Sequence, residues 1–140
     1  MAPLMSRFQV TLVSPEQLLY ADEVNQVDLP GAEGDLGVLA GHAPIVTMLR
    51  PGIATLITDD ARESFVLLGG LAEFSSGQLT ILAETASPVR EFDLAALENR
   101  IEELESTLRQ TAPGQELDNA IARLDHYKAI HVTLTQATAF

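Results

Sequence analysis

The hydrophobic period of the chain changes near residue 88, and this change constrains the fold more than any other feature. Before it, apolar residues alternate with polar ones or stand in short runs, as at Phe8, Val10 and Leu12. After it, apolar residues recur every three or four positions. A period of two is typical of strands, and a period near 3.6 is typical of helices. The sequence therefore predicts a β domain over residues 1–87 and a helical domain over residues 88–140.

Short turns separate the apolar runs of the first part. Residues 53–58 lead into the polar segment 59–62, residues 65–68 end at Gly69 and Gly70, and residues 79–83 follow a turn at 75–77. Apolar runs joined by such short turns predict antiparallel hairpins. Many short strands with Gly and Pro between them predict a β-sandwich or barrel. The core is expected to be aliphatic, because aromatic residues make up only 5% of the chain.

Two apolar seams predict an antiparallel two-helix hairpin in the second part. Asp93 is the expected N-cap of the first helix, and residues 111–114 end it with a Pro-Gly pair. The second seam shifts around Tyr127. The seam residues are Leu94, Leu97, Ile101, Leu104 and Leu108 in the first helix, and Leu117, Ile121, Leu124, Ile130 and Leu134 in the second.

Charge and composition exclude several classes of protein. The net charge is −12, with 3 − 11 = −8 in residues 1–87 and 5 − 9 = −4 in residues 88–140. Two acidic parts argue against binding to nucleic acid or an anionic membrane surface and favour a basic protein surface. The chain has no cysteine for a disulfide or a Cys-based metal site. It lacks the run of about 18 apolar residues that membrane insertion needs, and we expect no secretory leader.

The segment 30–44, PGAEGDLGVLAGHAP, is rich in glycine. Its spacing matches neither GxGxxG nor GxxxxGK[ST], and it has no lysine to reach a phosphate. We expect its glycines to supply positive φ for successive turns. His42 with Asp35 or Glu33 suggests an acid–histidine pair, but a nucleophile is missing, so we favour a contact or turn-shaping role over catalysis.

No metal site is expected. His126 and His131 lie five residues apart, which turns them by about 500° to different faces of a helix. The acids Glu98, Glu102, Glu103 and Glu105 favour a solvated helix face, with docking to a basic partner as the alternative.

The segments EGDLGVLAGHAP and LRPG within residues 27–52 closely resemble the ATP synthase epsilon subunit family. Residues 65–70, FVLLGG, residues 79–86, LTILAETA, and residues 8–16, FQVTLVSPE, are similar to it as well. The resemblance implies a flattened antiparallel β-sandwich followed by a helical hairpin. It also implies a non-catalytic rotor subunit without a cofactor, which couples c-ring rotation to ATP synthesis in the proton-translocating F-type enzyme.

The same resemblance implies partners and contact residues. The partners are the gamma subunit, the polar loops of the c-ring and, through an extended tail, the catalytic alpha/beta head. The location is the cytoplasmic face of the bacterial inner membrane, as a peripheral protein. By motif position Asp35 matches the acidic residue that meets the c-ring loops, His42 matches a family histidine of the same loop region, and Glu33 lies beside Asp35.

Some family members inhibit ATP hydrolysis with the extended hairpin, and ATP bound to the folded hairpin opposes this. Asp93 matches the first residue of that nucleotide motif, but Ala96-Leu97 stands where Arg-Ala is usual. Arg123 aligns with one family arginine, and Asn119 replaces another. The pair Asp93 and Arg123 is therefore expected to be a vestigial nucleotide site with weak or absent ATP binding. The acidic tail predicts weak inhibition.

Three other interpretations remain open. The chain could be a module whose main task is to sense ATP through the hairpin, or a small hydrolase that uses Asp35 and His42. It could also be the equivalent mitochondrial delta subunit. The start of the chain does not look like an Arg- and Ser-rich transit peptide, which favours a bacterial source.

Overall fold

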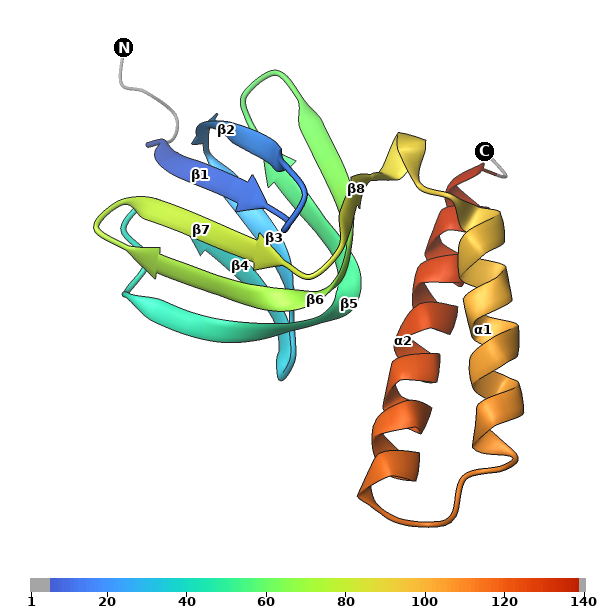
Figure 1. Ribbon diagram of the computed structural model, residues 1–140. Helices are drawn as coiled ribbons and strands as arrows, with labels where there is room; N and C mark the ends of the chain where they lie inside the picture. The colour runs from blue at the N-terminus through green and yellow to red at the C-terminus, as the bar shows by residue number, and fades with distance from the viewer. Residues whose placement is uncertain (1–5, 139–140) are drawn as a thin grey trace. The chain divides into compact units, whose positions relative to one another are not determined.

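The computed structural model describes residues 6–138, and it divides into two compact units. The first unit ends at Arg90 and the second begins at Glu91. The hydrophobic pattern of the sequence predicted this boundary three residues earlier, between residues 87 and 88. Figure 1 shows strands in the first unit and helices in the second, so the predicted fold class is confirmed.

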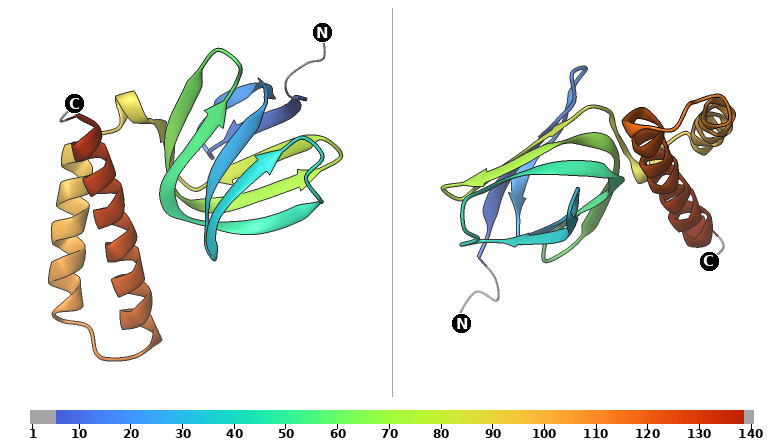
Figure 2. Two further views of the ribbon diagram at one scale, coloured as in Figure 1. Left: turned by 180° about the vertical axis from the view of Figure 1, so that it is seen from behind. Right: turned by 90° about the horizontal axis from the view of Figure 1, so that it is seen from below.

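The first unit is a β-sandwich of eight strands. Figure 2 shows that the strands fold over one another as two layers. Seven strands follow the order β2-β1-β7-β6-β5-β3-β4, and β8 pairs with β6. Strands β1 and β7 are parallel, and the other pairs are antiparallel. The strands are β1 Phe8–Val13, β2 Leu18–Val24, β3 Gln26–Gly31, β4 Gly34–Leu39, β5 Ile45–Ile57, β6 Arg62–Ser75, β7 Gln78–Ala83 and β8 Ala86–Pro88.

The core forms from the inward residues of the alternating strands. Phe8, Val10 and Leu12 are buried, as their spacing predicts. Most core residues are aliphatic, and Phe8 packs edge-on against Phe74 with ring centroids 5.5 Å apart. Burial of such side chains stabilises the sandwich by roughly 1.5–3 kcal/mol each. This scaffold holds the loops at its ends in place.

Two sequence interpretations of the first unit were wrong. Gly69 and Gly70 do not end a strand but lie inside β6, which pairs with β8 before them and with β7 after them. A Cβ on Gly70 would lie 2.3 Å from the Leu82 carbonyl oxygen, so this glycine permits a close approach of two strands. The segment 30–44 is also not a plain loop, because it contains strand β4.

The second unit contains helix α1, Leu94–Leu108, and helix α2, Gln115–Thr138, after a short 3-10 helix η1, Val89–Glu91. The Asp93 carboxylate accepts a hydrogen bond from the Ala96 backbone N–H at 3.0 Å, so the expected N-cap is present. Two polar contacts connect the helices: an ion pair of Glu105 with Lys128 at 3.4 Å, and a contact of the Glu98 carboxylate with the His131 Nε2 at 3.1 Å.

The seam of α2 differs from the predicted one. Leu124, Tyr127, Ile130 and Leu134 are buried, whereas Ile121 is exposed. Their spacing of 3, 3 and 4 keeps these four side chains on one stripe, with Tyr127 inside it. Ile121 lies about 120° around the helix from Tyr127, which takes it off the stripe.

Candidate functional site

The glycine-rich segment forms a β-hairpin that ends in a tight tip. Strands β3 and β4 pair from Gln26 with Leu39 to Gly31 with Gly34, so Ala32 and Glu33 make the two-residue turn. A Cβ on Gly31 would lie 2.5 Å from the Gly34 carbonyl oxygen, and only glycine fits there. The Ala32 N–H donates to the Met48 carbonyl oxygen at 2.8 Å and ties the tip to β5. The tip therefore presents Glu33 from a fixed backbone.

Two of the four glycines of this segment meet the expectation of positive φ, and two do not. Gly34 has φ +137° and Gly41 has φ +85°, so these two supply positive φ at the ends of β4. Gly31 and Gly37 do not have positive φ. Gly31 instead allows the close approach within the hairpin turn.

Asp35, next to the tip, pairs with Arg50. The Arg50 Nη2 donates to the Asp35 carboxylate at 2.5 Å, and the Nη1 donates to the Gly31 carbonyl oxygen at 2.5 Å. The Asp35 side chain remains 84% exposed, whereas that of Arg50 is 28% exposed. The Asp35 side chain is thus exposed, and its charge is balanced by the less exposed guanidinium of Arg50.

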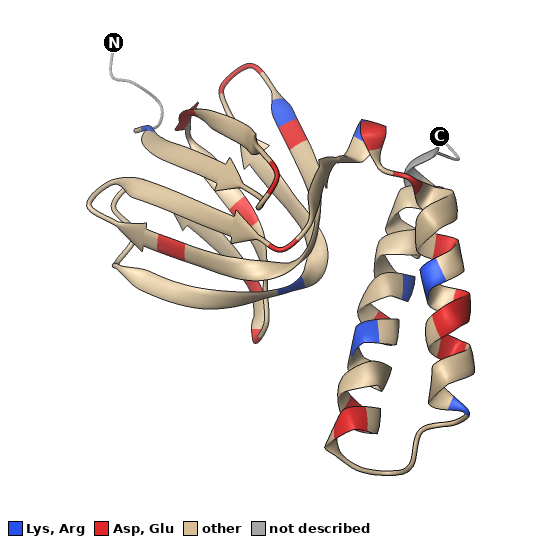
Figure 3. Cartoon of the chain, in the orientation of Figure 1, with Lys and Arg blue, Asp and Glu red and all other residues tan. Residues whose placement is uncertain are grey.

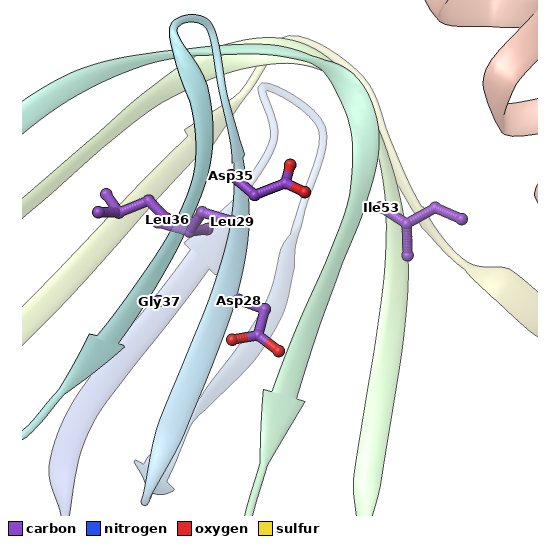
Figure 4. Close-up of a pocket in the computed structure, with 6 residues that line it drawn as sticks. All are labelled: Asp28, Leu29, Asp35, Leu36, Gly37 and Ile53. Atoms are coloured by element: carbon purple, nitrogen blue, oxygen red, sulfur yellow. The ribbon is translucent and has the colours of Figure 1, made fainter.

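A bend in β5 leaves an open hollow beside the hairpin. The pairing of β3 with β5 is regular up to Asp28 with Thr55 and resumes only at Gly31 with Leu49. The hollow has a volume of about 310 Å³, and in Figure 4 the carboxylates of Asp28 and Asp35 lie on the same side of the hairpin, toward β5. It is lined by Asp28, Leu29, Asp35, Leu36, Gly37 and Ile53.

His42 lies away from Asp35. Asp35 is at the start of β4 and His42 follows its end, so the strand from Asp35 to Leu39 separates them by roughly 13 Å at 3.3 Å per residue. The His42 Nδ1 lies 2.7 Å from the Ala43 carbonyl oxygen, and its ring packs edge-on against Phe74 at 5.9 Å. The structure therefore does not bring Asp35 and His42 together as an acid–histidine pair, and His42 contacts the turn that it was expected to shape.

A row of apolar side chains crosses the outer face of five neighbouring strands. Met48 on β5 is opposite Leu71 on β6, which is opposite Leu82 on β7. Leu82 is opposite Val13 on β1, which is opposite Leu18 on β2. Met48, Leu82 and Leu18 are 61%, 48% and 59% exposed. We call these five residues the apolar row.

Few charges surround the apolar row. Strands β1 and β7 carry no charged residue, as Figure 3 shows, and β5 carries only Arg50. The next row across the same strands consists of Val46, Glu73, Thr80, Thr11 and Ala21, with one acid among them. An exposed apolar row of this kind is a candidate contact site for another protein.

The two residues of the expected nucleotide site lie far apart. Asp93 precedes α1, and its carboxylate caps that helix. The pairs Glu105–Lys128 and Glu98–His131 set the register of the hairpin and place Asp93 opposite the last turns of α2. Arg123 lies about 14 residues before these last turns, which is roughly 20 Å along α2. This conformation therefore does not assemble Asp93 and Arg123 into one site.

Residues 6–138 contain no group of three or more His, Cys, Asp or Glu side chains placed to hold a metal ion. Within the same range, neither helix is both long and apolar enough to span a bilayer.

Sequence reasoning missed two features of this unit. Arg50 was noted only as part of the LRPG segment, because its two acceptors, Gly31 and Asp35, lie 19 and 15 residues away in the sequence. The apolar row was missed because its members belong to five separate strands, and only the register shows that they are neighbours.

Comparison with known proteins gives a consistent result. Residues 7–89 match the family model described as "ATP synthase, Delta/Epsilon chain, beta-sandwich domain". The chain is 62% identical to ATP synthase epsilon chain 2 of Nitrobacter hamburgensis, over 97% of this chain and 100% of that protein. It is 53% identical to the ATP synthase epsilon chain of Afipia carboxidovorans, over 94% and 98%.

Two solved structures have a similar fold. A chain of the Euglena gracilis mitochondrial ATP synthase, in its OSCP/F1/c-ring assembly, matches with a TM-score of 0.76 and 24% identity over 95% of this chain and 84% of that chain. A chain of the Tetrahymena thermophila mitochondrial ATP synthase, from its central stalk and c-ring, matches with a TM-score of 0.62 and 17% identity over 96% and 98%.

Proposed function

The chain belongs to the ATP synthase delta/epsilon chain family, and from that premise we propose that it is the epsilon subunit of a bacterial F-type ATP synthase. In this role it is a non-catalytic part of the central stalk, turning with the c-ring and coupling that rotation to ATP synthesis. The names of its bacterial relatives support the proposal. So does its fold, which it shares with chains of two ATP synthase assemblies.

The apolar row is the observation that carries the proposal. Its five side chains lie side by side on a rigid sheet, and three of them are about half exposed or more. Burying each exposed side chain against a partner would contribute roughly 1.5–3 kcal/mol. We assign this surface to the gamma subunit, because a shaft that carries torque needs an apolar contact that salt does not weaken.

We assign the tip of the β3–β4 hairpin to a second contact, with the polar loops of the c-ring. Glu33 in the turn and Asp35 beside it on β4 are exposed, and the turn is fixed to β5 by the Ala32 hydrogen bond and by Arg50. Such a tip can accept hydrogen bonds from the polar loops of the c-ring. His42, at the other end of β4, lies apart from the tip, and its ring packs against the buried Phe74.

The same geometry supports a role without bond chemistry. Asp35 is engaged by Arg50, and the His42 ring contacts Ala43 and Phe74. The two groups that a small hydrolase would use are thus occupied by separate structural contacts. As part of the complex, the subunit would lie at the cytoplasmic face of the inner membrane, held there through its partners.

Copurification tests the proposed function. The wild-type chain is added to membranes stripped of their own epsilon subunit, and ATP synthase is then isolated through its gamma subunit. We expect the chain in the purified complex in one copy per gamma subunit, and we expect restored coupling of proton flow to ATP synthesis. A chain that remains in the wash, and that turns over a small molecule alone, would refute the assignment.

A further inference from the structure

Arg50 contacts both arms of the β3–β4 hairpin from a third strand. Its Nη1 donates to the Gly31 carbonyl oxygen on β3, and its Nη2 donates to the Asp35 Oδ1 on β4. These two acceptors flank the turn residues Ala32 and Glu33. A planar guanidinium can hold two acceptors at fixed positions, which a lysine ammonium on a flexible stem does less well.

The pairing also changes what Asp35 offers to a partner. Its Oδ1 is taken by Arg50, while among residues 6–138 no partner is found for Oδ2 on a side chain that is 84% exposed. The pair is neutral overall, so it attracts a distant cation little. It can still accept one short hydrogen bond at Oδ2. The free charge at the tip is that of Glu33.

We propose that Arg50 is the positioning residue of the tip: it fixes Asp35 so that Oδ2 alone accepts a hydrogen bond from a single N–H or cationic donor on the partner. This inference rests on the proposed function, since the partner is the protein that meets the tip. It separates two roles. Glu33 supplies long-range attraction, and Asp35 supplies a short, oriented contact.

Binding kinetics with the assembled enzyme test the role. The full chain and the variants Arg50→Met, Arg50→Lys, Asp35→Asn and Asp35→Asn/Arg50→Met are bound to ATP synthase that lacks this subunit, at low and high salt. Arg62→Met removes the same charge at the exposed start of β6 and is the matched control.

We expect Arg50→Met and Asp35→Asn each to speed dissociation by roughly fivefold, the upper range for an exposed pair. Arg50→Lys should recover part of the loss. In the Arg50→Met background, Asp35→Asn should change dissociation by less than about twofold, because the two act as one unit. Arg50→Met should also make association more salt-dependent, since it frees the Asp35 charge. Arg62→Met should leave dissociation unchanged.

Amide exchange on the isolated chain gives a second readout that needs no partner. If Arg50 positions the tip, Arg50→Met will speed exchange at Gly34 and Asp35 relative to the amides of β7, while Arg62→Met will not. If the wild-type chain fails to bind the enzyme but the tip still loosens in this way, the proposed function fails and the positioning role stands. Equal effects of Asp35→Asn in both backgrounds, or unchanged exchange at the tip, would overturn the role of Arg50.

Discussion

Gly52 lies directly against Pro30 at the bend of β5. A Cβ on Gly52 would lie 2.6 Å from the Cβ of Pro30. This contact occurs in the stretch where β3 and β5 stop pairing, beside the hollow and the tip. The glycine of the LRPG segment is therefore needed for the approach of two strands rather than for an unusual φ.

Gly52→Ala should destabilise the sandwich. Neither ring nor backbone can yield easily at this contact, and overpacking of this kind costs about 1–3 kcal/mol. We expect a lower urea midpoint with an unchanged slope. Gly37→Ala serves as the control, since its φ is not positive and its Cβ would meet only the Asp28 Oδ1 at 3.6 Å, an ordinary van der Waals contact. A Gly52→Ala chain as stable as the wild type would show that Pro30 can move away.

Tyr20 should make the stability of the sandwich depend on alkaline pH. Burial raises the pKa of Tyr20 above 10.0, and the nearby carboxylates of Asp22 and Glu63 raise it further. The folded state therefore holds the phenol proton more tightly than the unfolded state. The contribution of Tyr20 to the free energy of unfolding is complete below pH 10, and it is lost as the pH rises through the pKa of the folded state.

Tyr20→Phe tests this dependence, because it keeps the ring and removes the proton. Urea midpoints measured at about pH 9, 10 and 11 should fall more steeply for the wild type than for Tyr20→Phe. The comparison cancels the titration of lysine, which both proteins share. Parallel curves for the two proteins would contradict the expected effect.

The hairpin should bind ATP weakly or not at all. Asp93 is engaged in capping α1, and Arg123 lies roughly 20 Å away along α2. The Arg123 guanidinium is therefore not beside Asp93 to pair with phosphates, and each missing charge-assisted bond is worth about 1.5–3 kcal/mol. Calorimetric titration of the full chain with Mg-ATP should give no binding at millimolar nucleotide. A dissociation constant at or below about 1 mM would reverse this expectation.

Removal of the tail should change ATP hydrolysis by less than about twofold, since the family resemblance implies an acidic surface on the catalytic head, which an acidic tail fits poorly. Residues 88–140 carry a net charge of 5 − 9 = −4. The cut is best placed after Arg90, because Ala86, Ser87 and Pro88 form β8 and pair with β6. The assay compares the assembled enzyme with full-length and shortened chains. Several-fold activation on truncation would mean that the tail is a strong inhibitor.

The sequence predicted local structure better than long-range contacts. Alternation at Phe8, Val10 and Leu12, and the N-cap at Asp93, depend on neighbours in the chain, and both predictions are confirmed. Strand β4 was missed because glycine and exposed positions hide its alternation. Ile121 was placed on the wrong side of α2 because Tyr127, which belongs to the seam, was treated as an irregularity.

The candidate site shows the same limit. Asp35, Glu33 and His42 could be named from the family resemblance, yet their arrangement could not. The Asp35–Arg50 pair joins β4 to β5, and the separation of Asp35 from His42 follows from the extension of β4. Leu82 and Met48 become neighbours of Leu71 only through strand pairing.

The assignment of the apolar row to the gamma contact has a matched test within one sheet. Leu82 lies in the row and is 48% exposed, whereas Leu39 lies on β4 outside it and is 45% exposed. The measurement is the dissociation constant of Leu82→Asn and Leu39→Asn for ATP synthase that lacks this subunit. We predict a loss of roughly 10- to 100-fold for Leu82→Asn, as expected for an apolar contact of about 1.5–3 kcal/mol, and little change for Leu39→Asn. Equal affinities for the two variants would contradict the assignment.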